Sequence, residues 1–236
     1  MKEERMQLTT KDGVVLYGIF VPALNNPPVG GAPAIVLLHM MPAVKESWAA
    51  FQAVGSQAGF QSLAIDLRGH GESIMKEGQK IDYRQFTDAE HREKIHDAEA
   101  AVRFFLGRGV PFSSIALAGA SIGANLALAY QAEHGEVKAS VLLSPGLDYR
   151  GIKTEPFARG IKEEQSIFVA AAKDDERASG NSCADMAQTL FDISKSNNKK
   201  IKIFDGAEHG TDMFRAHPEL MHDIIAWLRE IYFSEL

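Results

Sequence analysis

Short apolar runs recur along the chain, and within each run apolar residues follow one another without polar alternation. Strands buried on one face alternate in polarity, whereas strands buried on both faces read as continuous apolar stretches of this length. The pattern therefore predicts strands in the interior of a sheet. The runs span residues 34–38, 61–65, 114–118, 138–143, 166–172 and 200–204.

Between these runs lie segments in which apolar residues recur with the spacing of a helix. Strands that alternate with helices build a mostly parallel sheet with helices on both faces. An antiparallel hairpin is expected ahead of them, because Asp12 and Gly13 form a turn signal between two strand-like segments. We therefore predict an α/β fold with an eight-stranded sheet. The helical segments span residues 46–58, 88–106, 122–133, 181–195 and 217–232.

The bulk properties fit one large domain, residues 1–236, without a linker or internal repeat. The net charge of −6 is spread along the chain, which argues against a nucleic-acid partner. The N-terminal segment, residues 1–5, carries four charged side chains and no long apolar stretch follows, so we expect neither a signal peptide nor a membrane span. The single cysteine, Cys183, cannot form an internal disulfide, and a cytoplasmic location is the default. Monomer and homodimer are both compatible with this composition.

The most informative motif is the pentapeptide G-A-S-I-G at residues 119–123, with Ser121 at its centre. It lies between a predicted strand and a predicted helix, so the chain turns sharply at the serine. Small residues allow the strand and the helix to approach closely, and the serine is held in a strained conformation with its hydroxyl exposed. This context predicts a nucleophile elbow.

A serine hydroxyl needs a base, and the best candidate is His209, on the loop between the last predicted strand and the last helix. An acid must orient the imidazole. One of Asp174, Asp175 and Glu176, which follow the strand at 166–172, is expected to do so. All these residues lie beyond carboxyl ends of strands, where parallel sheets bind their ligands. The chain order is serine, acid, histidine.

Two further motifs accompany the serine. Leu37-Leu38-His39 ends the run at 34–38, and residues 66–73 read D-L-R-G-H-G-E-S. Together with the elbow and the leading hairpin, they resemble the α/β-hydrolase-fold serine hydrolases of the esterase/lipase or dienelactone-hydrolase-like type, over nearly the whole chain. Dienelactone hydrolases proper carry cysteine at the elbow and haloalkane dehalogenases carry aspartate, so Ser121 argues against both chemistries.

The resemblance implies roles for residues of the turn loops. The oxyanion donors are expected to be the backbone N–H of Ile122 and that of Met41, with Met40 as the alternative to Met41. The usual glycine after the motif histidine is replaced by Met40, and the methionine side chains are expected to line an apolar pocket. The spacing through residue 179 favours Asp175 over Asp174 as the acid.

Other polar residues in these motifs receive structural interpretations. We expect His39 to orient the oxyanion loop, and Asp66, Arg68 and His70 to stabilise their turn, with His70 near the pocket rim. Cys183 is interpreted as a small, partly buried residue.

The segment 146–165 is too short for a helical cap domain and predicts a small flap, in which Tyr149 and Phe157 are possible pocket residues. Residues 74–87 form a second rim loop. Such an open site suits small to medium soluble esters.

We therefore predict a carboxylic ester hydrolase that acts through an acyl-enzyme and needs neither a metal nor an organic cofactor. Thioesterase, lactonase, small peptidase and acyltransferase activities would use the same triad. A non-catalytic binding module on the same scaffold is the alternative from another class.

Overall fold

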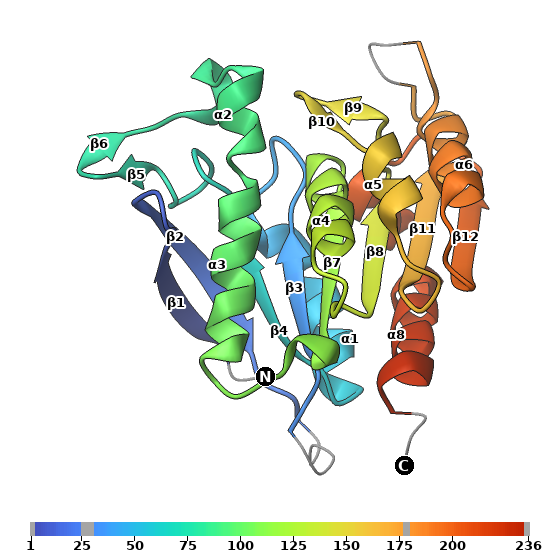
Figure 1. Cartoon of the computed structure of the whole chain (residues 1–236), viewed down its shortest axis with the longest axis horizontal. Coiled ribbons are helices and arrows are strands. Elements are labelled where there is room, and N and C mark those ends of the chain that lie inside the picture. The colour runs from blue at the N-terminus through green and yellow to red at the C-terminus, as the bar shows by residue number, and fades with distance from the viewer. Residues whose placement is uncertain (1–2, 25–30, 177–179, 234–236) are drawn as a thin grey trace.

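The main sheet has ten strands within the residues that the structure describes, which are 3–24, 31–176 and 180–233 (Figure 1). In this computed structural model the strand order is β12-β11-β8-β7-β3-β4-β2-β5-β6, and β1 pairs with β2 off this path. Residues 1–2 of the charged N-terminus and residues 177–179, which entered the choice of Asp175, lie outside the described ranges. The long strands are β1 (Glu4–Thr9), β2 (Val14–Val21), β3 (Ala34–Leu38), β4 (Gln61–Ile65), β7 (Ile115–Ala120), β8 (Ala139–Leu143), β11 (Ser166–Ala172) and β12 (Asn198–Phe204).

These eight long strands are the predicted ones, and those from β12 to β4 pair in parallel. The hairpin of β1 and β2 is antiparallel, with Thr9 opposite Val15. The prediction of eight strands missed β5 (Met75–Lys76) and β6 (Gln79–Lys80), a hairpin that extends the sheet beside β2. Strands of two residues are too short to show a hydrophobic period, so the pattern of apolar residues does not predict them.

The interior strands are buried on both faces, as their continuous apolar runs predict. Along β3, Val36 and Leu38 belong to one hydrophobic cluster, whereas Ile35 and Leu37 belong to the cluster on the opposite face. All four side chains are fully buried. Each face of the sheet therefore needs its own layer of helices.

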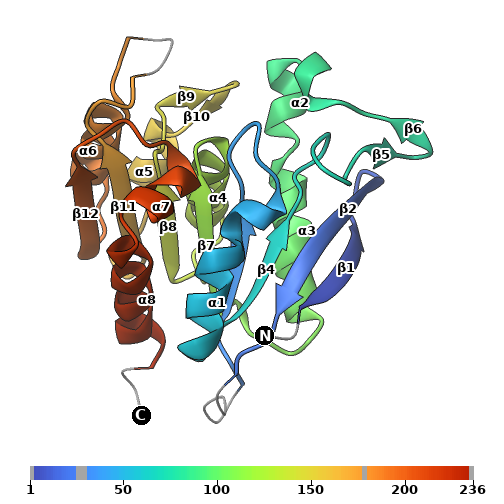
Figure 2. The same ribbon diagram turned by 180° about the vertical axis from the view of Figure 1, so that it is seen from behind.

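Figure 1 shows the layer formed by α3, α4, α5 and α6, and Figure 2 shows α1, α7 and α8 on the other side of the sheet. No helix of the described residues is long and apolar enough to cross a bilayer. The helices are α1 (Ala49–Gln57), α2 (Asp88–Arg92), α3 (Ile95–Leu106), α4 (Ile122–Glu133), α5 (Glu155–Gly160), α6 (Cys183–Ile193), α7 (Met213–Ala216) and α8 (Glu219–Tyr232).

One predicted helix, residues 88–106, is divided into α2 and α3. At the junction the backbone N–H groups of Lys94, His96 and Asp97 bond to carbonyls three residues earlier. These tighter turns interrupt the regular helical bonding between residues 92 and 95. The side chain of Lys94 is fully buried there, with its Nζ 2.8 Å from Nδ1 of His91.

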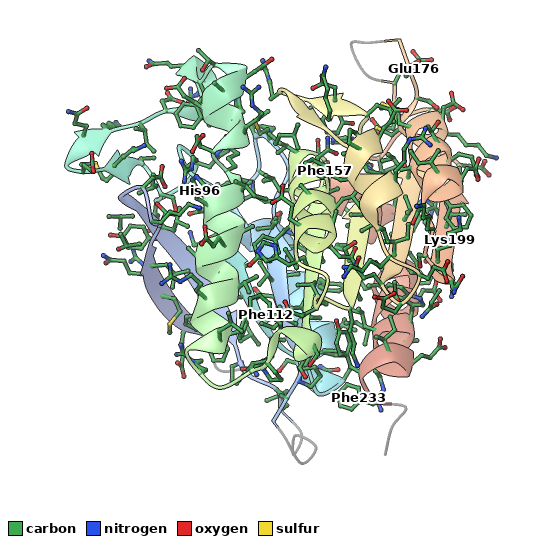
Figure 3. All side chains as sticks on the ribbon, in the orientation of Figure 1. His96, Phe112, Phe157, Glu176, Lys199 and Phe233 are labelled. Carbon is green, nitrogen blue, oxygen red and sulfur yellow. The ribbon has the colours of Figure 1, made fainter. Side chains whose placement is uncertain are left out.

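The segment 146–165 forms a small flap with more regular structure than the sequence indicates. It contains the hairpin of β9 (Asp148–Tyr149) and β10 (Ile152–Lys153), followed by α5. Phe157, labelled in Figure 3, lies on α5 beside α4. Within the described residues, no larger cap interrupts the fold, as predicted. The flap lies near the carboxyl ends of the parallel strands, where the candidate catalytic residues also follow.

Candidate active site

Ser121 occupies a strained turn between β7 and α4. Its backbone dihedrals are φ 54° and ψ −120°, a conformation that non-glycine residues rarely adopt. A Cβ atom on Gly119 would collide with the backbone of Gly123, and a Cβ on Gly123 would collide with the carbonyl of Leu38. Both glycines are therefore needed for the close crossing of strand and helix, and this crossing holds Ser121 in the geometry of a nucleophile elbow.

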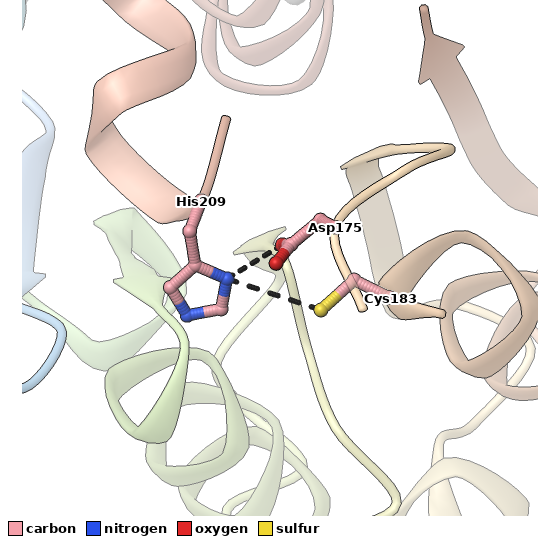
Figure 4. A group of neighbouring side chains, drawn as sticks. All are labelled: Asp175, Cys183 and His209. Atoms are coloured by element: carbon pink, nitrogen blue, oxygen red, sulfur yellow. Dashed lines mark hydrogen bonds and ion pairs between the residues drawn. The ribbon is translucent and has the colours of Figure 1, made fainter. Parts of the chain in front are cut away.

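His209 and Asp175 form a hydrogen-bonded pair. Nδ1 of His209 lies 2.6 Å from Oδ2 of Asp175, and the side chains are 16% and 3% exposed, respectively. The carboxylate can only accept, so Nδ1 carries a proton, and in the neutral ring Nε2 then has the lone pair. Figure 4 shows Nε2 on the side of the ring away from Asp175. Among the neighbouring acids it is Asp175, rather than the exposed Asp174, that the structure brings to the imidazole.

The loop that carries His209 packs directly on the elbow. The backbone N–H of Gly210 donates to Oγ of Ser144, at 2.9 Å. Gly210 has a φ of 57°, and a Cβ at this position would press on the side chains of Ala120 and Met40. The residue after His209 thus contacts the residue before Ser121, which places the predicted base and nucleophile at neighbouring positions.

The oxyanion loop is fixed by His39. Its Nδ1–H donates to the carbonyl of Met40 at 2.8 Å, and its Nε2 accepts from the N–H of Leu67 at 2.9 Å. This pattern requires a neutral ring, and burial lowers the pKa of His39 to about 4. His39 thus acts as an orienting residue, as expected. The Met41-Pro42 peptide that follows is cis.

One of the two predicted oxyanion donors, Ile122, directly follows Ser121 in the elbow. Ile122 is the first residue of α4, so its N–H has no acceptor within the helix and remains available to an oxyanion. The N–H of Ser121 itself bonds to the carbonyl of Leu143 at 2.8 Å. The side chain of Met40 packs with one hydrophobic cluster and that of Met41 with the other.

The turn at residues 66–73 is held by ionic contacts. Asp66 accepts from Lys45 Nζ and from the N–H of Lys45, both at 2.8 Å. Arg68 pairs with the fully buried Asp97, with Nε 2.8 Å from Oδ1. These residues stabilise the turn, in agreement with the structural interpretation.

His70 of the same turn stacks on Tyr83, with ring centroids 3.7 Å apart. Its Nδ1–H donates to the carbonyl of Arg68. Nε2 is buried and has no hydrogen-bond partner among the described residues. Together with Pro42 and Tyr83, His70 lines a cavity of about 350 Å³ next to the oxyanion loop.

The three predicted pocket residues have different surroundings. Met40 lies against Gly210, and the ring of Tyr149 faces His209 edge-on with centroids 6.5 Å apart. Phe157 instead lines a second cavity, of about 370 Å³, between α4 and the flap, together with Leu126. The volumes of both cavities are in the range of small-molecule sites.

Two residues near the site were not recognised in the sequence. Ser144, which follows β8, accepts the hydrogen bond from the N–H of Gly210; its place at a strand end was the only available signal.

Cys183 is fully buried at the start of α6, with Sγ 3.9 Å from Nδ1 of His209. Its backbone N–H donates to the carbonyl of Asp175 at 2.8 Å, and the hydroxyl of Tyr149 lies 3.3 Å from its sulfur. Asp175, Cys183 and His209 are thus grouped closely enough to serve as metal ligands.

A family model described as the alpha/beta hydrolase fold matches residues 33–168. The chain belongs to the α/β-hydrolase fold family. The matched residues include the elbow and the oxyanion loop, whereas Asp175 and His209 lie after the matched range. Among curated proteins, none matched the sequence.

Solved structures of this fold align with nearly the whole chain. An esterase from Pyrococcus furiosus has a TM-score of 0.75 at 18% identity, covering 97% of this chain and 92% of its own. For a thermostable carboxyl esterase from Bacillus coagulans the TM-score is 0.77 at 13% identity, with coverage of 98% and 99%. A dienelactone hydrolase from Anabaena variabilis has a TM-score of 0.71 at 15% identity, with coverage of 99% and 97%. At these identities the likeness shows the fold.

Proposed function

We propose that this α/β-hydrolase is a serine hydrolase that cleaves carboxylic esters of small to medium soluble substrates. Ser121 is the nucleophile, His209 the general base and Asp175 the acid that orients the imidazole. The observation that carries the proposal is the Asp175–His209 hydrogen bond of 2.6 Å on a loop packed against a strained serine. The esterases among the similar structures add support from the fold alone.

The proposed reaction proceeds in two steps. Nε2 of His209 takes the proton of the Ser121 hydroxyl while the oxygen attacks the ester carbonyl, and the N–H groups of Ile122 and Met41 stabilise the oxyanion. The imidazolium then protonates the leaving alcohol, and an acyl-enzyme remains on Ser121. Water, activated by the same nitrogen, hydrolyses this ester and regenerates the serine. Asp175 stays ionised throughout and stabilises the imidazolium.

The cavity beside the oxyanion loop supports substrates of modest size. Its volume of about 350 Å³ suits a small acyl or alcohol group better than a long lipid chain. A series of p-nitrophenyl esters tests this point. Activity is expected to peak at short or medium acyl chains, and a steady rise beyond about eight carbons would contradict the proposed substrate size.

The nucleophile is tested by labelling with a fluorophosphonate probe and by turnover of p-nitrophenyl acetate. Ser121→Ala should abolish both. Ser113→Ala is the matched control. Ser113 is an exposed serine that precedes the amino end of β7, whereas Ser121 follows the carboxyl end of the same strand. Undiminished labelling of Ser121→Ala would refute the assignment. A wild-type protein with turnover no higher than that of Ser121→Ala would favour a non-catalytic binding module.

A further inference from the structure

The buried side of the His209 imidazole faces two other ligand atoms, not one. A carboxylate oxygen of Asp175, Sγ of Cys183 and a ring nitrogen of His209 all lie within 4.8 Å of one another (Figure 4). They come from the turn after β11, the start of α6 and the loop after β12. Oriented as it is toward Asp175, the imidazole has Nδ1 at 2.6 Å from the carboxylate and 3.9 Å from the sulfur.

This set of atoms matches the ligands of zinc. Thiolate, imidazole and carboxylate bind Zn²⁺ in tetrahedral sites, where ligand atoms are about 3.3 to 3.6 Å apart for typical bond lengths. Asp175 and His209 would separate by about 0.7 Å to reach this geometry, and Cys183 would approach His209 by about 0.3 Å. Both movements are within the reach of side-chain rotation. Hard cations such as Mg²⁺ prefer an all-oxygen set, so the sulfur selects against them.

The surroundings hold the three residues in place. The hydrogen bond from the N–H of Cys183 to the carbonyl of Asp175 joins two of the ligands through the backbone. The hydroxyl of Tyr149, 3.3 Å from Sγ, can donate a hydrogen bond to a thiolate and so act as an outer partner of a bound metal. The His209 side chain is 16% exposed, so the cluster is not sealed from solvent.

We propose that Asp175, Cys183 and His209 bind a thiophilic divalent cation such as Zn²⁺, and that the bound cation switches the hydrolase off. The binding site follows from the geometry alone, whereas the inhibition depends on the proposed function. Within the triad, the metal site and the catalytic site share two side chains, so the protein cannot use both at once.

The inhibition follows from a proton balance on the imidazole. To bind a metal, Nδ1 of His209 gives up its proton, and Nε2 takes one, so the ring stays neutral but changes tautomer. Cys183 loses its thiol proton to solvent, and one proton is released for each cation bound. Nε2 then carries a hydrogen where catalysis needs a lone pair, so it cannot accept the proton of Ser121.

Cobalt tests the binding site without any need for activity. Co²⁺ is added to the full chain carrying Ser121→Ala, in reducing buffer. Cys183 is the single cysteine, so a thiolate-to-cobalt charge-transfer band in the near ultraviolet reports this residue alone. We expect the band to appear and to be displaced by Zn²⁺ but not by Mg²⁺. Because this variant keeps all three ligands, absence of the band would overturn the site.

Zinc inhibition tests the switch in the otherwise unaltered enzyme. Zn²⁺ should inhibit p-nitrophenyl acetate hydrolysis, and a chelator should restore it. Cys183→Ala should still hydrolyse the ester but should require at least ten times more Zn²⁺ for half inhibition. His96→Gln controls for adventitious surface binding, because His96 lies 2.9 Å from a carboxylate oxygen of Glu93. This variant should be inhibited like the wild type.

The outcomes separate the two proposals. Equal inhibition of wild type and Cys183→Ala would overturn the switch, since the cation would then act elsewhere. A cobalt band in a protein without ester hydrolysis would leave the metal site standing and refute the proposed function instead.

Discussion

The backbone N–H of Gly210 donates a 2.9 Å hydrogen bond to the side-chain oxygen of Ser144. Ser144 is buried and has a φ of 49°, and its own N–H bonds to the carbonyl of Ala170 in β11. The preceding residue, Leu143, accepts the N–H of Ser121. The end of β8 therefore holds both the elbow and the histidine loop.

Ser144→Ala should lower kcat more than it raises KM. Loss of the hydrogen bond frees Gly210 and lets His209 shift relative to Ser121, for which we expect a decrease in kcat of about ten- to a hundredfold. Ser140→Ala is the matched control, because Ser140 lies on the same strand and donates to Gln131 within the interior. Both variants should lose about 1 kcal/mol of stability. Steady-state kinetics with equal kcat for the two variants would argue against a positioning role for Ser144.

Asp175→Asn should lower kcat by about 10⁴-fold while leaving the fold intact. An asparagine amide is uncharged, and its NH2 group donates where a carboxylate oxygen accepts, so the imidazole loses both its preferred tautomer and its charge partner. Asp174→Asn, at the exposed neighbouring position, should remain within a few fold of wild type. Burst and steady-state assays of both variants decide the assignment, and the reverse order of activities would transfer the role to Asp174.

Gly123→Ala should destabilise the protein by roughly 2 kcal/mol and reduce activity, because the added methyl group collides with the backbone of Leu38. Gly160→Ala is the control, since its Cβ would meet only the side chain of Ala132, at ordinary contact distance. The control should be neutral or slightly stabilising. Urea unfolding measures both differences, and a Gly123→Ala variant as stable as the wild type would show that the strand and helix can separate.

Lys94 should make stability depend on pH above neutrality. Burial lowers its pKa to about 7, whereas an unfolded lysine titrates near about 10.4. Between these values the unfolded chain binds the extra proton, so wild-type stability rises with pH. Relative to Lys94→Met, the wild type should gain on the order of 2 to 4 kcal/mol from pH 7 to 10. Lys80→Met, at an exposed position, controls for loss of a lysine. A constant difference between wild type and Lys94→Met would contradict the burial argument.

The sequence revealed features that depend on local pattern and missed those that depend on packing. The buried strands were readable because continuous apolar runs such as that of β3 reflect burial on both faces. The pentapeptide around Ser121 was readable because its two glycines avoid collisions that any Cβ atom would cause at this turn. Cys183 offered no such signal, since its distance from His209 is set by the docking of α6 on the sheet. The break at Lys94 likewise follows from a buried contact with His91.

The edge position of β12 has a consequence for how the molecule behaves on warming. Ser121 follows β7 in the middle of the sheet, whereas His209 follows β12, which among the described residues pairs with β11 alone and is partly exposed. Fraying begins at such edges and spreads inward. The base should therefore lose its alignment while the nucleophile is still held, so that heat abolishes turnover at a lower temperature than it melts the sheet.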